Sequence, residues 1–338
     1  MIKRILYTLL IMFPVLASAQ INTDRVMAIG RNALYFEDYV LSIQYFNQVI
    51  NAKPYLSDPY FYRGLAKINL DDFQGAESDC SEAIERNPFV VSAYQVRGLA
   101  RIQQNNFAGA IEDYTKALEF DPENIGVWHN MALCRIRQED YKGAKNDLDK
   151  LIAISPRYTK AYLMRGEVDL KQKDTLAAEK DFGKAIEIDR YDADTWASRA
   201  ILRLQQQRYK DAEADFDHAI RLSTRNSGVY INRALARYHQ NNLRGAMSDY
   251  DIALDIDPNN FIGHYNRGLL RAQVGDDNRA IQDFNFVIEM EPDNMMAIFN
   301  RGLLLDQTGD YKGAIKDYST VINEYPNFLL GYQYRAQA

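Results

Sequence analysis

The sequence has few of the residues that metal sites, disulfide frameworks and nucleic-acid surfaces require. Its 338 residues include only four histidines, none paired at helical metal-ligand spacing, and two cysteines, too few for the framework of a small disulfide-stapled domain. Lys and Arg number 40 against 46 Asp and Glu, a net charge of −6, and no basic block occurs. A partner made of DNA or RNA is therefore not expected.

Signatures of catalysis are also missing. The chain contains no HExxH, no CxxC and no glycine-rich phosphate loop, and no Ser or Cys nucleophile can be matched with a positioned base. We therefore expect a chain that is not an enzyme and that needs no cofactor or metal. With only nine prolines, 18 glycines, 47% hydrophobic and 25% charged residues, the composition favours a folded helical protein.

The first 19 residues are typical of a secretory signal peptide. Two basic residues precede an apolar run at 5–16, which is short for a membrane span, and Ala-Ser-Ala at 17–19 supplies the small residues that a signal peptidase needs. We expect cleavage after Ala19, export to the periplasm or cell envelope, and no membrane span afterwards. The alternative is a hydrophobic first helix of the fold.

One period of 34 residues dominates the rest of the sequence. Segments 98–118 and 302–322 align without an insertion, and seven of the nine prolines recur in the same register. Nine complete repeats fill residues 23–328, after a lead-in at 20–22 and before the start of a tenth at 329–338. Places in each repeat are numbered 1 to 34 from its first residue.

Small and large residues recur at fixed places of the repeat. Place 8 is Gly or Ala throughout, place 20 is Ala in all repeats but the first, and place 24 is usually bulky. Small side chains allow two helices to approach closely, and the bulky series fills the space beside that contact. Each repeat therefore predicts two antiparallel helices, at about places 2–14 and 18–30, with the proline at place 32 ending the second.

These features, together with an aromatic residue at place 4, make the sequence resemble the tetratricopeptide-repeat (TPR) family, exported bacterial type. The place-4 aromatics are Tyr60, Tyr94, Trp128, Tyr162, Trp196 and Tyr230. The resemblance covers about nine-tenths of the chain. It implies an all-α, right-handed superhelical solenoid of antiparallel helix pairs, whose concave wall is built from the first helices and binds peptides or protein segments. Local departures at Arg190, Thr224, His264 and Ile298 are expected to open the angle between neighbouring repeats.

Charged residues also follow the repeat, with Arg at place 7, Asp at place 23 and often a second basic residue at place 11. The helical direction of place 7 predicts a ladder in which Asp of one repeat meets Arg of the next, for example Asp79 with Arg97 and Asp283 with Arg301. Such buried pairs set register more than they add net stability. An anion-binding stripe of arginines is the alternative, and Met131 interrupts either arrangement.

Places 2, 5, 6, 9 and 13 point away from the partner helix and are expected to line the concave wall. Place 9 is apolar in seven repeats, whereas the carboxylate clamp that the resemblance implies would need Asn there and more basic residues than Lys160. An apolar strip edged by amides suits an extended or helical peptide, with exposed aromatics at place 5 as anchors. The alternative, that the leucines only support the wall, stays open. The candidate binding residues are Phe61, Leu99, Asn130, Asn232, Leu235, Tyr265, Asn266, Leu269, Phe299, Asn300, Gln103, Arg137, Lys171, Gln205, His239, Gln273 and Gln307.

Two further expectations concern the cysteines and the last residues. Cys80 and Cys134 fall at apolar places two repeats apart, which favours buried free thiols. Residues 329–338 begin a first helix without a polar cap, so we expect either more chain beyond Ala338 or self-association through this end.

The function that these patterns favour is a non-catalytic protein–protein interaction scaffold of the cell envelope. A second hypothesis is the docking arm of a larger envelope enzyme or assembly complex whose active part lies beyond residue 338. A third is a purely structural spacer.

Overall fold

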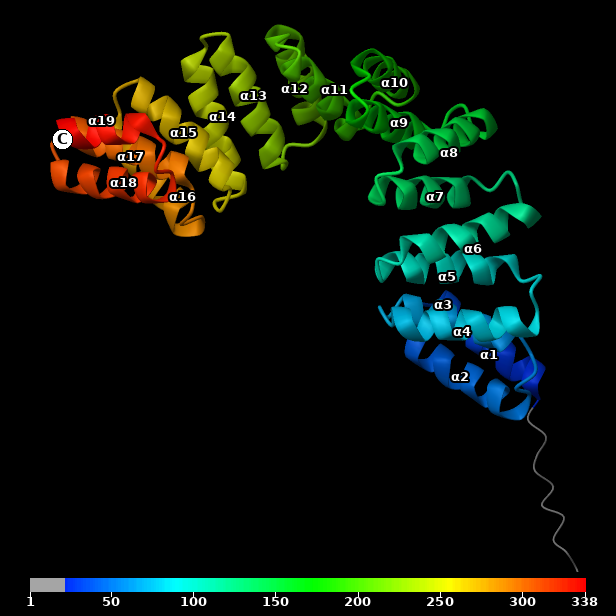
Figure 1. Cartoon of the computed structure of the whole chain (residues 1–338). Coiled ribbons are helices and arrows are strands. Elements are labelled where there is room, and N and C mark those ends of the chain that lie inside the picture. The colour runs from blue at the N-terminus through cyan, green and yellow to red at the C-terminus, as the bar shows by residue number, and fades with distance from the viewer. Residues whose placement is uncertain (1–21) are drawn as a thin grey trace, which may run out of the picture. The chain divides into compact units, whose positions relative to one another are not determined.

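The structure is a computed structural model that describes residues 22–338, and in this range every regular element is an α-helix. The expected signal peptide and the residues up to 21 lie outside the described part. The all-α fold class is confirmed. The helices, shown in Figure 1, are α1 (Thr23–Tyr35), α2 (Tyr39–Ala52), α3 (Asp58–Ile68), α4 (Phe73–Arg86), α5 (Val91–Gln103), α6 (Phe107–Phe120), α7 (Ile125–Arg137), α8 (Tyr141–Ile154), α9 (Thr159–Lys171), α10 (Thr175–Ile188), α11 (Ala193–Gln205), α12 (Tyr209–Leu222), α13 (Ser227–His239), α14 (Leu243–Ile256), α15 (Phe261–Gln273), α16 (Asp277–Met290), α17 (Met295–Gln307), α18 (Tyr311–Glu324) and α19 (Leu329–Gln337).

Each repeat folds as one pair of helices. Odd-numbered helices from α1 to α17 pack against the even-numbered helix that follows, and α19 packs against α18. In most repeats the first helix occupies places 1–13 and the second 17–30, so most helices begin one residue before their predicted start.

The turn between the two helices has the same geometry in every repeat. The residue at place 15 has a positive φ, from 59° at Asp71 to 88° at Gly309. The residue at place 16 is usually Asp or Asn and caps the second helix, as where Asp140 Oδ1 accepts a hydrogen bond of 3.0 Å from Gly143 N. The cap satisfies a backbone donor that the first helical turn leaves free.

The core of each repeat lies between its two helices. Alanines at place 20 and the large residues at place 24, such as Phe182 and Phe216, are fully buried. The space at place 8 is tight, because a Cβ added to Gly166 would lie 2.6 Å from Phe182 Cε1. This close approach explains the small residue at place 8.

The helices form two compact units, one ending at Pro156 with α1–α8 and one from Arg157 to Ala338 with α9–α19. The division follows repeat 4, which keeps the proline at place 32. The four departures from the repeat pattern, Arg190, Thr224, His264 and Ile298, all lie within the second unit.

Within each unit several first helices of successive repeats approach one another. In the first unit α3 contacts α1 and α5, and α5 contacts α7; in the second unit α11 contacts α9 and α13, and α15 contacts α17. No two successive second helices approach as closely within residues 22–338. The first helices therefore form a shared surface in each unit, here called the first-helix wall.

Candidate functional site

The apolar row at place 9 lies on the first-helix wall and is open to solvent in part. In the first unit Leu99 is 38% exposed, and in the second unit Leu269 is 40% exposed. The other members are half-buried; they are Leu65, Leu133, Ile201, Leu235 and Leu303. The row is therefore a partly exposed apolar strip on the first-helix wall of each unit.

Amide side chains lie along the strip. In the second unit Asn232, Asn266 and Asn300 are half-buried, and Asn300 Nδ2 donates a hydrogen bond of 3.1 Å to Tyr265 Oη. The place-13 side chains of this unit are exposed; they are Lys171, Gln205, His239, Gln273 and Gln307. His239 stacks on Tyr209 of the preceding repeat at 4.6 Å, so its ring also has a packing role.

The expectation of exposed aromatic anchors at place 5 is wrong. Phe61 and Tyr265 are half-buried, and Tyr265 meets Phe284 of its own repeat with ring centroids 5.8 Å apart. Phe299 packs between Phe328, at 5.1 Å, and Tyr318, at 5.8 Å. The rings are long enough to reach the second helix of their repeat, and this removes most of their apolar area from solvent.

A pocket of about 560 Å³ opens beside the wall of the first unit. The residues that line it include the apolar Ile102 and Leu133 and the polar Gln103 and Arg137. The structure thus brings together two predicted place-13 residues, both exposed, around a hollow between α5 and α7. Asn130, also predicted, lies on α7 and is half-buried.

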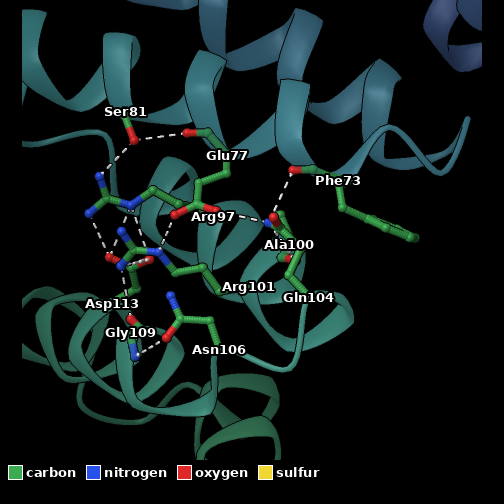
Figure 2. Close-up of polar contacts among 10 residues, drawn as sticks. All are labelled: Phe73, Glu77, Ser81, Arg97, Ala100, Arg101, Gln104, Asn106, Gly109 and Asp113. Atoms are coloured by element: carbon green, nitrogen blue, oxygen red, sulfur yellow. Dashed lines mark hydrogen bonds and ion pairs between the residues drawn. The ribbon is translucent and has the colours of Figure 1, made fainter.

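The repeated Arg and Asp residues form a polar seam inside the stack, which Figure 2 shows for repeats 2 and 3. Arg97 Nη2 donates to Asp113 Oδ1 of its own repeat at 2.6 Å, and its Nη1 donates to Ser81 Oγ of the preceding repeat at 3.1 Å. Arg101 joins Asp113 Oδ2 at 3.1 Å and Glu77 Oε1 of the preceding repeat at 2.8 Å. Each arginine therefore ties its own repeat to its neighbour.

The predicted partners in this ladder are corrected by the structure. Asp79 binds Arg63 rather than Arg97, and Arg301 binds Asp317 of its own repeat at 2.7 Å rather than Asp283. Place 7 does face the preceding repeat, but the guanidinium has enough donors to span the seam. Its Nε and Nη2 donate two hydrogen bonds to the buried Asp, and its Nη1 donates to a polar residue at place 25 of the preceding second helix.

This pairing leaves the arginines no role as an anion-binding stripe. The paired arginines are only 12–23% exposed, and the aspartates are nearly fully buried. Burial lowers and the carboxylate hydrogen bond raises the pKa of Arg233, and the net direction is upward. The seam is thus an internal structural network.

Repeat 4 interrupts the network where Met131 replaces the arginine. Arg135 Nε lies 3.1 Å from Asp147 Oδ2, but among the described residues that oxygen has no aligned hydrogen-bond donor. Burial raises the pKa of Asp147 from its ordinary 3.8 to about 6. The interruption predicted from the sequence therefore leaves an incompletely paired carboxyl group.

Both cysteines are free and buried, as expected, and burial raises the pKa of Cys80 to about 12 and of Cys134 to about 11. No cluster of three or more His, Cys, Asp or Glu side chains suited to a metal occurs among residues 22–338. In the same range, no helix has the length and apolar character that crossing a membrane requires.

Paired helices in a 34-residue period, stacked through small residues and an Arg/Asp seam, define a helical repeat protein. Sequence models of the tetratricopeptide repeat match residues 125–158, 159–192, 198–261 and 265–327, and a model described as TPR repeat matches 98–134. Together they cover more than half of the chain, which belongs to the tetratricopeptide-repeat family. The family is generally non-catalytic and supports a role as a protein-interaction scaffold.

Comparison with solved structures gives the same fold. A tetratricopeptide-repeat protein from Parabacteroides merdae is 21% identical, with a TM-score of 0.57 over 74% of this chain and 98% of that one. The C-terminal part of a TPR repeat-containing protein from Cytophaga hutchinsonii is 17% identical, with a TM-score of 0.57 over 70% and 97%. The APC/C hetero-tetramer Cut9–Hcn1 aligns at 13% identity and a TM-score of 0.57 over 86% of this chain and 57% of that one. No curated protein matches the sequence significantly.

Proposed function

We propose that the protein is a non-catalytic scaffold that binds segments of partner proteins along its first-helix walls. The observation that carries the proposal is the partly exposed row at place 9, with Leu99 and Leu269 each more than a third exposed on a helical surface. Apolar strips edged by polar groups are typical of protein interfaces.

The second unit supports the proposal most fully. Leu235 and Leu269 lie one repeat apart, and Asn232 and Asn266 occupy the corresponding place 6 beside them. An extended partner segment can cover the leucines with alternate side chains while its main chain bonds to the amides. Membership of the TPR family supports the same reading.

Substitution of the strip tests the proposal. We expect Leu235→Asp and Leu269→Asp to abolish recovery of partners in co-purification, because a carboxylate at the strip must be desolvated when the partner binds. The matched control is Ile252→Asp on the second helix α14, where Ile252 is 37% exposed, close to the 40% of Leu269. Unchanged recovery with folded Leu235→Asp and Leu269→Asp variants would refute the proposal.

Export to the periplasm or cell envelope is part of the same proposal and rests on the sequence of residues 1–19 alone. N-terminal sequencing of protein isolated from its native cells is expected to begin at Gln20. Protein that begins at Met1 in the exported fraction would contradict cleavage after Ala19.

Self-association through the C-terminal helix stays a prediction. On α19, Leu329 is 81% exposed and Leu330 is 50% exposed. If this surface joins two copies, the mass measured by light scattering at low concentration will exceed that of one chain, and Leu329→Asp will restore the single-chain mass. A single-chain mass for the unmodified protein would exclude self-association.

A further inference from the structure

A second pocket lies away from the first-helix wall, in the second unit. It is formed by the end of α10, the loop that follows, the start of α11 and the end of α12, and its volume is about 480 Å³. Arg190, Tyr191, Trp196, His218, Arg221 and Leu222 line it. All of these residues belong to repeats 5 and 6.

Two departures from the repeat pattern converge on this pocket. Place 32 is proline in seven repeats but arginine at Arg190. Place 29 is acidic in five repeats, at Glu85, Glu119, Glu187, Asp255 and Glu289, but basic at Arg221. Each departure introduces an arginine, and both arginines line the same hollow.

These two arginines differ from those of the polar seam. Both are exposed, and within residues 22–338 neither guanidinium makes an ion pair or hydrogen bond. The acid in the pocket lining, Glu187, is bound to Lys184 at 2.8 Å. The pocket therefore presents two unneutralised cations on a chain whose net charge is −6.

The remaining lining is aromatic and apolar. Trp196 stacks on His218 with ring centroids 4.2 Å apart, and its Nε1 donates a hydrogen bond of 3.0 Å to the carbonyl oxygen of Arg190. Tyr191 is 74% exposed and Leu222 is 38% exposed. A ligand that placed its negative charge between the arginines could also cover this apolar surface.

We propose that this pocket binds an acidic segment of a partner protein, with an Asp or Glu carboxylate held between Arg190 and Arg221. An apolar side chain next to that carboxylate contacts Tyr191 and Leu222. A planar carboxylate matches the fork of guanidinium donors, and the exposed ring and leucine favour a peptide over a bare inorganic anion. The site is separate from the first-helix wall and gives the scaffold a second interaction surface.

The test uses the mature chain and a fluorescent synthetic peptide in which Glu and Asp alternate with Leu and Phe. The control peptide carries Gln and Asn in place of the acids, and binding is followed by fluorescence anisotropy. We expect the acidic peptide to bind about tenfold more tightly than its amide counterpart, with the difference reduced by added salt.

Two variants restore the residues that other repeats carry, so both are compatible with the fold. Arg190→Pro is suited to this backbone, because Trp128 donates to Pro122 in the way that Trp196 donates to Arg190. Arg190→Pro and Arg221→Glu are each expected to weaken binding of the acidic peptide about tenfold without lowering the melting temperature. Arg244→Ala, at an exposed arginine of α14, is the control and leaves binding unchanged.

Four results would overturn the proposal. Equal binding of the acidic and amide peptides would show that charge does not contribute to binding. Unchanged binding by both arginine variants would show that the peptide does not bind in this pocket. Loss of peptide binding in Leu235→Asp but not in the arginine variants would assign the peptide to the first-helix wall instead. Binding of phosphatidylserine vesicles, but not of the peptide, with the same dependence on Arg190 and Arg221 would replace the peptide with an anionic lipid surface.

Discussion

At the scale of single residues, the buried aspartate at place 23 has the largest energetic consequence. Asp283 is 2% exposed and receives donors from Arg267 Nη2 at 2.8 Å and Arg271 Nη1 at 2.8 Å, with His264 Nδ1 at 3.0 Å. A buried ion pair adds little net stability over an apolar pair, but removing one partner leaves the other charge uncompensated.

Replacing this aspartate should therefore destabilise the fold strongly. We expect Asp283→Asn to lower the free energy of unfolding by about 3–5 kcal/mol, because two arginines lose their shared carboxylate. Urea denaturation measures the change. The control Glu119→Gln breaks the exposed pair with Lys116, and a much smaller change is expected because solvent screens this pair. Equal effects of the two substitutions would contradict the account of the seam.

The repeat 4 interruption gives a prediction about pH. Because the folded-state pKa of Asp147 is raised above its unfolded value, the folded protein binds the extra proton between pH 3.8 and about 6. The contribution of Asp147 to stability is therefore greatest below this window and is lost as the pH rises through it.

Met131→Arg should remove this pH dependence. Thr115 Oγ1 lies 4.0 Å from the Met131 sulfur, at the place where Ser81 accepts a hydrogen bond from Arg97. We expect the free energy of unfolding to rise by roughly 1–3 kcal/mol at pH 7. We also expect it to change less between pH 4 and pH 6 than in the unmodified protein. Urea denaturation from pH 4 to pH 7 measures both effects. A loss of stability at pH 7 would mean that the arginine does not reach Asp147.

Sequence alone predicted the charged residues of the seam but not their partners. The period identified Arg at place 7 and Asp at place 23, and the helical angle placed Arg toward the preceding repeat. The angle of a Cα does not fix where a long side chain ends, and Arg97 reaches both Asp113 and Ser81. The expectation for the place-5 rings was wrong for the same reason. The helical angle of their Cα atoms does not show that the rings are long enough to reach the second helix.

At the scale of secondary-structure elements, the turn at place 15 stores backbone strain in seven repeats. Residues such as Glu139 and Gln207 adopt φ values of 61° and 60°, a left-handed conformation that side chains disfavour. Only Gly275 and Gly309 meet the requirement without a Cβ. The period predicted a turn here, but not its handedness, because most repeats carry no glycine at this place.

Alanine substitutions at two glycines should change the free energy of unfolding in opposite directions. Gly309→Ala places a Cβ at φ 88°, and we expect a loss of about 1 kcal/mol. Gly183→Ala lies inside α10, where an added Cβ meets no atom within 4 Å, and we expect a gain of about 0.5–1 kcal/mol. Thermal unfolding followed by circular dichroism measures both, and changes of the same sign would contradict this assignment.

At the scale of the whole molecule, most of the fold could be predicted from the sequence because the same helix pair is repeated nine times. Each helix pair has small residues at places 8 and 20, most have a capping residue at place 16, and the helix bounds were predicted to within a residue or two. The division of the helices after Pro156 was not predicted, since repeat 4 keeps every residue that marks the end of a second helix.

The two proposed interaction surfaces differ in how far the sequence predicts them. The apolar row and its amides follow the period, whereas the two arginines of the pocket, Arg190 and Arg221, are exceptions to the period. Comparing the repeats place by place, with attention to departures that introduce the same charge, could have found that pocket from sequence.

Site-specific photocrosslinking tests the central claim most directly. A photoreactive amino acid replaces Leu269 on the first-helix wall in one protein and Ile252 on the second helix α14 in another, two sites of nearly equal exposure at 40% and 37%. In native cells we predict discrete crosslinks to partner proteins from position 269 that Leu235→Asp abolishes, and none from position 252. Equal crosslinking from both positions, or crosslinks at 269 that persist with Leu235→Asp, would contradict binding on the first-helix wall.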